Sequence, residues 1–178
     1  QQFIVVDDDG LRFTLDEGLL STVLGRAPPN MRVSIVSIVG RFRTGKSFML
    51  DLMLRFLYNS GDGDWFEGSG DKLGGSNNDG ADGDSAGFLW RHGKERQTTG
   101  MWIWSHPFIR KLDSGEEVAV FLLDTQGMFD SKTGQMLTAC IFGLSTLISS
   151  YQIYNVERRI GEDNLQHLAL FSEYGRCV

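Results

Sequence analysis

The sequence is poor in cysteine and in long hydrophobic runs. Its two cysteines, Cys140 and Cys177, show neither a disulfide framework nor the spacing of metal ligands, so we interpret both as ordinary thiols in a reducing compartment. The longest apolar run, 137–148, is too short to span a bilayer, and no signal peptide opens the chain. We therefore expect any membrane attachment to lie outside these residues.

A basic surface is missing as well. The net charge is −6, and residues 61–86, with seven acidic side chains and one lysine, contribute −6 by themselves. A nucleic-acid-binding protein needs a basic stripe along the phosphate backbone, so we predict no nucleic-acid partner. Residues 61–86 also contain eight glycines and lack the ligand spacing of a calcium loop. This composition is typical of a solvated, largely disordered surface insert.

With 178 residues, 41% of them hydrophobic, the chain has the size and composition of one globular domain. The expected strands are 3–6, 12–14, 31–39, 101–109, 117–123 and 150–156, and the expected helices are 14–24, 47–58, 133–148 and 163–174. Thr14 and Glu17 are expected to form a capping box at the first helix. The alternation of strands and helices predicts an α/β fold, with a mainly parallel central sheet and helices on both faces.

The pattern Gly-x-x-x-x-Gly-Lys-Ser occupies residues 40–47, between an expected strand and an expected helix. Such a loop binds phosphate because its backbone N–H groups point inward and the helix N-terminus adds partial positive charge. Lys46 would reach the β- and γ-phosphates, and the Ser47 hydroxyl would hold Mg²⁺. The alternative is a glycine-rich turn with an exposed lysine. In this strand–loop–helix context, the pattern indicates a phosphate site.

The segment VAVFLLDTQG, residues 118–127, is a second candidate element. An aspartate at the carboxyl end of a buried strand, here Asp124, can hold Mg²⁺ through water. The N–H of Gly127 can meet a γ-phosphate oxygen. The alternative is a turn aspartate that caps the next element. Because both motifs occur together in this order, we favour the nucleotide interpretation.

The segment KERQTTG, residues 94–100, is a candidate switch. A nucleotide switch needs a threonine whose hydroxyl coordinates Mg²⁺ only while the γ-phosphate is present. Thr98 and Thr99 both qualify chemically. Two threonines that merely begin a strand are the alternative.

Four blocks of the sequence resemble the amino-terminal part of the atlastins, which are dynamin-like large GTPases near the guanylate-binding proteins. The blocks are GRFRTGKSFMLDLMLRFLYN, GFLWRHGKERQTTGMWIWS, VFLLDTQGMFDS and STLISSYQIYNV with EDNLQHLALFSEYGR. The resemblance runs from about residue 13 to 176 and implies a phosphate-loop NTPase G domain. It further implies that 1–178 is a partial GTPase domain, truncated on its C-terminal side and interrupted by the insert 61–86.

The resemblance also implies roles for individual residues. Arg43 would be an arginine finger supplied in cis and brought into place when two G domains pair, and Arg41 is the other arginine that could be confused with it. The switch contact to Mg²⁺ is assigned to Thr98. Met128 stands where small G proteins carry their water-positioning glutamine, and Gln126 precedes the glycine of that motif. We therefore expect backbone groups of the loop and switch, completed by dimerisation, to orient the water.

The candidate site follows from these motifs. We predict catalysis by Arg43, Lys46 and Thr98, and metal binding by Ser47, Thr98 and, through water, Asp124. We predict nucleotide contacts from Gly40, Arg41, Phe42, Arg43, Thr44, Gly45, Lys46, Ser47, Phe48, Gln126 and Gly127.

The function implied by the resemblance is hydrolysis of Mg·GTP, coupled to homodimerisation through the nucleotide-binding face. It would drive homotypic fusion or tethering at the cytoplasmic face of endoplasmic reticulum membranes, through membrane segments absent from this chain. The alternatives are a guanylate-binding-type GTPase and a nucleotide-dependent interaction module without efficient hydrolysis. A phosphate-loop kinase would need a lid that carries arginines. Because the insert 61–86 is acidic, it does not fit that role, and we do not favour a kinase. No Asn-Lys-x-Asp motif occurs here, so guanine specificity rests on the resemblance alone.

Overall fold

The computed structural model describes residues 1–7, 12–41, 43–59, 88, 100–127, 135–157, 159–162, 164–166 and 168–169. The insert 61–86, Phe42, and the expected switch threonines Thr98 and Thr99 lie outside the described residues. Of the expected last helix, 163–174, residues 164–166 and 168–169 are helical, and the remainder lies outside the description.

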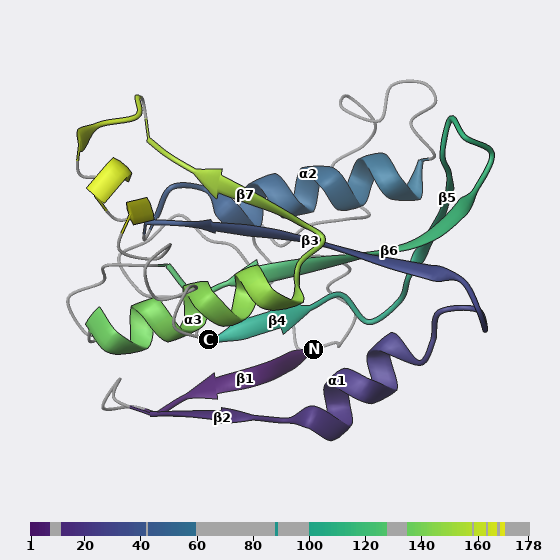
Figure 1. The fold of residues 1–178 in the computed structure, drawn as a ribbon, viewed down its shortest axis with the longest axis horizontal. Coiled ribbons are helices and arrows are strands. Elements are labelled where there is room, and N and C mark those ends of the chain that lie inside the picture. The colour runs from purple at the N-terminus through teal and green to yellow at the C-terminus, as the bar shows by residue number, and fades with distance from the viewer. Residues whose placement is uncertain are drawn as a thin grey trace, which may run out of the picture.

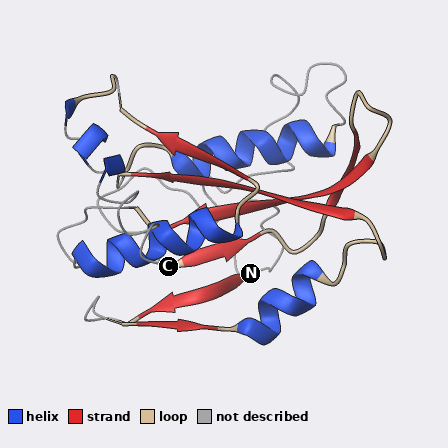
Figure 2. Ribbon diagram, viewed as in Figure 1, coloured by secondary structure: helices blue, strands red, loops and turns tan. Residues whose placement is uncertain are grey.

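The described strands and helices are interspersed along the chain, which confirms the predicted α/β class (Figure 2). They are β1 (Gln2–Val6), β2 (Phe13–Leu15), α1 (Glu17–Leu24), β3 (Arg32–Gly40), α2 (Lys46–Tyr58), β4 (Met101–Ile103), β5 (Phe108–Lys111), β6 (Glu117–Thr125), α3 (Gln135–Ile148) and β7 (Tyr151–Asn155). All the strands join one sheet in the order β2-β1-β4-β6-β3-β7, with β5 also paired to β6.

The sheet is mixed. Strands β6, β3 and β7 run parallel to one another, whereas β1, β2, β4 and β5 are added by antiparallel pairing. The prediction of a mainly parallel sheet is therefore correct only for β6, β3 and β7, the three strands next to the candidate phosphate loop, residues 40–47. The expected strand 101–109 is divided into β4 and β5, and the interruption contains Pro107, which has no N–H to donate to a strand ladder.

Each face of the sheet has its own hydrophobic core, because side chains alternate along the strands. On one face, α1 and α3 contribute Val23 and Ile141 to a cluster that includes Phe121 of β6. On the other face, Leu50 and Leu54 of α2 pack in a second cluster of buried residues. Helices therefore cover both faces, as predicted, with α2 opposite α1 and α3 (Figure 1).

Helix α1 begins with a different cap from the expected one. Asp16 is the N-cap, and its Oδ1 accepts a hydrogen bond of 2.8 Å from the backbone N–H of Leu19. Thr14 lies inside β2, where it pairs with Val5. The predicted capping box at Thr14 is wrong, because pairing with β1 keeps this stretch extended for two residues beyond the point where the box would start the helix.

Replacing Asp16 by alanine is expected to lower the free energy of unfolding by about 1 kcal/mol, the usual effect of removing an N-cap side chain. Thr14→Ala is the matched control, since it removes an exposed side chain that caps nothing. Urea denaturation of both variants measures the difference. A loss at Thr14 that equals or exceeds the loss at Asp16 would contradict this assignment of the cap.

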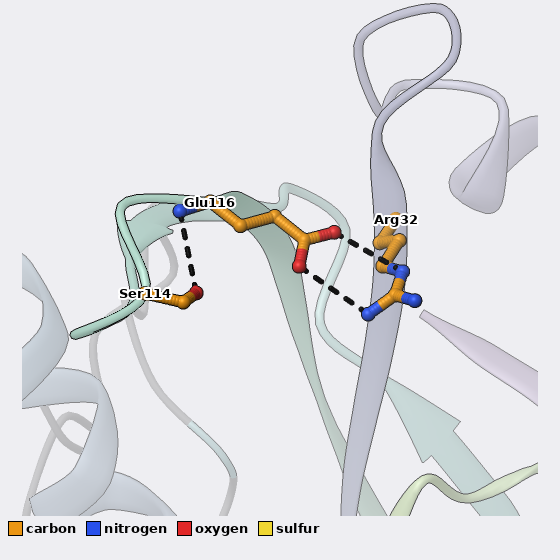
Figure 3. Close-up of polar contacts among 3 residues, drawn as sticks. All are labelled: Arg32, Ser114 and Glu116. Carbon is orange, nitrogen blue, oxygen red and sulfur yellow. Dashed lines mark hydrogen bonds and ion pairs between the residues drawn. The ribbon is translucent and has the colours of Figure 1, made fainter.

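At the amino end of β3, Arg32 forms an ion pair with Glu116 in the turn between β5 and β6 (Figure 3). Arg32 Nε lies 3.1 Å from Glu116 Oε1, and the Glu116 N–H donates to Ser114 Oγ at 3.4 Å. The two charged side chains are 75% and 43% exposed, so water screens the pair and its contribution is at most about 1 kcal/mol. The strand ladder between β3 and β6, rather than this pair, holds the two strands together.

A candidate phosphate-binding site at the carboxyl edge of the sheet

The predicted site residues that the structure describes lie at one edge of the sheet. Because β3, β6 and β7 are parallel, their carboxyl ends lie at the same edge, and the loop to α2 leaves β3 there (Figure 1). Ile38 pairs with Asp124 and Gly40 pairs with Asn155, so the ends of all three strands are in close register. Ligands of open α/β sheets bind outside such carboxyl ends.

Two glycines define the loop between β3 and α2. A Cβ on Gly40 would lie 2.3 Å from the backbone oxygen of Asn155, so only glycine fits against the end of β7. Gly45 has φ +82°, a left-handed conformation that favours glycine, and it is the N-cap of α2. No side chain caps the N-terminus of this helix. A helix start without a side-chain cap presents its N–H groups to an anion.

Lys46 is the first residue of α2 and is only 6% exposed. Its Nζ donates a 2.9 Å hydrogen bond to the backbone oxygen of Arg41. Burial lowers the pKa of Lys46 from 10.5 to about 8, while the Asp124 carboxylate acts in the opposite direction. The side chain is therefore still protonated at neutral pH, and its ammonium group is held where the loop would enclose a phosphate.

Ser47 and Asp124 join the two motifs that the sequence suggested separately. The Ser47 hydroxyl donates a 2.6 Å hydrogen bond to Asp124 Oδ2, and Asp124 is only 2% exposed. The next residue of β6, Thr125, donates its hydroxyl to the backbone oxygen of Ile38 at 2.7 Å. These contacts fasten the end of β6 to β3 and to the start of α2.

The Ser47 and Asp124 oxygens fit the chemistry of Mg²⁺, which prefers oxygen ligands and usually keeps several waters beside one or two protein carboxylates. Within the part of the chain that the structure describes, no three or more His, Cys, Asp or Glu side chains gather as metal ligands. Among the described residues, the candidate metal ligands are the Ser47 hydroxyl and, through water as predicted, the Asp124 carboxylate, while the predicted ligand Thr98 lies outside the description.

The remaining loop residues are more accessible. Arg41, Arg43 and Phe48 are exposed, and the Thr44 hydroxyl donates to the Arg41 backbone oxygen at 2.9 Å. Arg43 has φ +65°, a left-handed conformation that is uncommon for residues other than glycine. Such a conformation costs about 1–3 kcal/mol and is enriched at functional sites.

Gln126 and Gly127, the end of the second motif, are buried. The Gln126 side-chain oxygen accepts a 2.8 Å hydrogen bond from the Gly100 N–H, and the Gln126 N–H donates to the Gly100 oxygen at 2.7 Å. Gly100 has φ +69°, and a Cβ there would lie 1.8 Å from the backbone oxygen of Ile4. The Gln126 amide oxygen is therefore engaged by the backbone that directly follows the expected switch threonines.

One residue at this edge was missed by the sequence reasoning. Asn155, at the end of β7, donates its side-chain N–H to the backbone oxygen of Thr44 at 2.7 Å. The only signal in the sequence is its position, a polar residue next to the end of an expected strand. That signal becomes informative only when the neighbour of the strand is known.

Residues 11–178 match the family described as guanylate-binding protein, N-terminal domain. The chain belongs to this family. It is also similar to Atlastin-1 of Mus musculus, with 47% identity over 99% of this chain and 30% of the relative. Atlastin-1 of Bos taurus is 46% identical over 99% of this chain and 30% of the relative, and Atlastin-2 of Homo sapiens 42% over 99% and 28%. The resemblance inferred from the sequence blocks is confirmed.

The chain spans about 30% of the length of the curated relatives that it matches. Among the described residues, none of the helices combines the length and the apolar character that crossing a membrane requires.

Proposed function

We propose that this chain carries the phosphate-binding part of a G domain that binds and hydrolyses Mg·GTP. The observation that carries the proposal is the 2.6 Å hydrogen bond between Ser47 and Asp124. This bond joins the first turn of α2, where the phosphate loop ends, to the DTQG segment at the end of β6. Membership of the guanylate-binding protein N-terminal domain family and similarity to the atlastins support GTP as the nucleotide.

Binding rests on the loop. The backbone N–H groups of the loop and of the first turn of α2 would surround the phosphates, and the Lys46 ammonium would exchange its bond to the Arg41 oxygen for phosphate oxygens. Ser47, Thr98 and, through water, Asp124 would hold Mg²⁺. The bound ion would neutralise charge on the β- and γ-phosphates.

Catalysis would require stabilisation of the charge that develops as the γ-phosphoryl group is transferred to water. Lys46 supplies one cation for this purpose, and Arg43 supplies another as a finger in cis. The exposed, left-handed Arg43 supports this role, because its side chain is carried on the loop itself and is accessible to rearrangement. Pairing of two G domains would bring the guanidinium towards the γ-phosphate.

Orientation of the attacking water is assigned to backbone groups of the phosphate loop and the switch. Gln126 is a candidate for a side chain in that role, but its amide oxygen accepts from the Gly100 N–H. This contact favours a linking role for Gln126 between the end of β6 and the segment that carries Thr98. The N–H of Gly127 remains the proposed contact to the γ-phosphate.

At the level of the whole protein, we propose homodimerisation through the nucleotide face and tethering or fusion of endoplasmic reticulum membranes from their cytoplasmic side. Similarity to Atlastin-1 and Atlastin-2 supports this choice over a guanylate-binding-type activity. A nucleotide-dependent interaction module without efficient hydrolysis is the second candidate. The presence of Arg43, Ser47 and Asp124 together favours catalysis.

Steady-state hydrolysis of GTP and of ATP by the full-length protein tests the proposal directly. We expect turnover of GTP and none of ATP. Binding of GTP without turnover would select the interaction module instead. Turnover of ATP at a similar rate would contradict the assignment of guanine as the base. That assignment rests on similarity alone, because this chain contains no Asn-Lys-x-Asp motif.

A further inference from the structure

We propose that Asn155 is a positioning residue for the phosphate loop: its side-chain amide holds the Thr44 carbonyl so that the following N–H, that of Gly45, faces the phosphate. The inference rests on the proposed nucleotide function and adds a residue outside the sequence motifs to the site.

The contact is direct. Asn155 Nδ2 lies 2.7 Å from the backbone oxygen of Thr44, within the usual range for an N–H···O hydrogen bond. Asn155 is half-buried, so water is partly excluded from this bond. Because β7 pairs with β3 in parallel and Asn155 is opposite Gly40, the amide is attached to the sheet rather than to a mobile loop. Strand attachment limits the positions that the donor can adopt.

The peptide plane explains how the contact acts on the loop. A trans peptide unit is planar, and its C=O and N–H point in opposite directions. Drawing the Thr44 oxygen towards β7 therefore turns the Gly45 N–H away from β7, towards the space that the loop encloses. Gly45 has no side chain and a left-handed φ of +82°, so this peptide has conformational freedom that an external bond can remove.

Asn155 also contacts the other end of the loop. Its backbone oxygen would lie 2.3 Å from a Cβ placed on Gly40, which means that Gly40 packs directly against it. One residue of β7 thus restrains both the first glycine of the loop and the residue before the last glycine. Arg43, the proposed finger, stands immediately before Thr44, so the same restraint limits the segment from which the finger extends.

The test is Asn155→Leu in the full-length protein, because leucine has a similar shape and no N–H donor. We expect the Kd for GDP and for a non-hydrolysable GTP analogue, measured by calorimetry, to rise about 10-fold, the effect of one lost hydrogen bond that leaves its acceptor unpaired. Asn155→Gln keeps a donor on a side chain one methylene longer, and its affinity is expected between wild type and Asn155→Leu.

Gln152→Leu is the matched control on the same strand. Its Nε2 donates to Ser145 Oγ at 2.6 Å, on the side of β7 that faces α3, away from the loop. This variant is expected to lose thermal stability while its Kd stays within about twofold of wild type. If Asn155 had a purely structural role, Asn155→Leu would behave like Gln152→Leu, with a lower unfolding temperature and an unchanged Kd. That result would overturn the proposal.

The outcomes also separate this inference from the proposed function. A wild-type protein that turns over GTP, together with an Asn155→Leu variant that binds as tightly, overturns only the positioning role. A wild-type protein that binds neither nucleotide overturns both proposals. Should Asn155→Leu fail to fold, Asn155→Ala takes its place, and wild-type affinity in that variant contradicts the proposal equally.

Discussion

Replacing Lys46 by alanine is expected to abolish nucleotide binding in the full-length protein. The ammonium lies inside the loop, within 2.9 Å of the Arg41 oxygen, and would make charge-assisted hydrogen bonds to two phosphates. The loss of two such bonds corresponds to a fall in affinity of about two orders of magnitude or more. Calorimetry with GDP and a non-hydrolysable GTP analogue measures it, and unchanged affinity would contradict the phosphate-loop assignment.

Unfolding of the loop is a competing explanation for a loss of nucleotide affinity in Lys46→Ala. The variant Lys46→Met tests this explanation, because it removes the charge and keeps the volume of the side chain. At pH 7 the lysine is charged in both the folded and unfolded states, and the folded state bears the cost of burying the charge. Methionine removes this cost at similar volume. The Met variant is therefore expected to be at least as stable as wild type in urea at pH 7, although it does not bind nucleotide.

The difference in stability between wild type and Lys46→Met should depend on pH. The pKa of Lys46 is about 8 in the folded state, and we take 10.5, its ordinary value, for the unfolded state. Between these pH values the unfolded state binds more protons, so the stability of the wild type rises with pH relative to the Met variant. The stability advantage of the variant should shrink between pH 8 and pH 10.5. An advantage independent of pH would argue against the lowered pKa.

Replacing Arg43 by alanine is expected to lower kcat for GTP by about 10³ and to leave nucleotide affinity nearly unchanged. The side chain is exposed on the loop, so it adds little to the folded protein, and its proposed contribution is made only while charge develops on the γ-phosphoryl group. The substitution adds no conformational free-energy cost to the backbone, because alanine and arginine are both disfavoured at φ +65°. Single-turnover hydrolysis and equilibrium binding separate the two effects.

Arg41→Ala is the matched comparison, since Arg41 is also an exposed arginine of the same loop. Its backbone oxygen accepts from Lys46 and Thr44, and alanine keeps that oxygen in place. We expect a decrease in kcat far smaller than that of Arg43→Ala. The reverse ranking would move the finger to Arg41, and wild-type kcat in both variants would favour an interaction module.

The parts of the fold that sequence reasoning obtained are those controlled by local pattern. The residues of β3, the loop and α2 carry a strand period, a glycine signature and a helix period in direct succession. Their order was therefore readable without any tertiary contact, and the same pattern carried the proposal that they bind phosphate. The proximity of the loop to Asp124, seen in the hydrogen bond from Ser47, was predictable for a related reason. Parallel strands bring their carboxyl ends to one edge, and this rule holds whatever the loops do.

The sequence by itself determined the phosphate loop, the DTQG strand end and the α/β class, because each depends on neighbours within a few residues. Only the tertiary structure decided that Asp16 caps α1, that antiparallel strands make the sheet mixed, and that Asn155 and Gln126 hold Thr44 and Gly100. These outcomes depend on which strands become neighbours, and strand order is a property of the packed sheet. An amide at the end of a strand has no recognisable partner until the adjacent strand is in place.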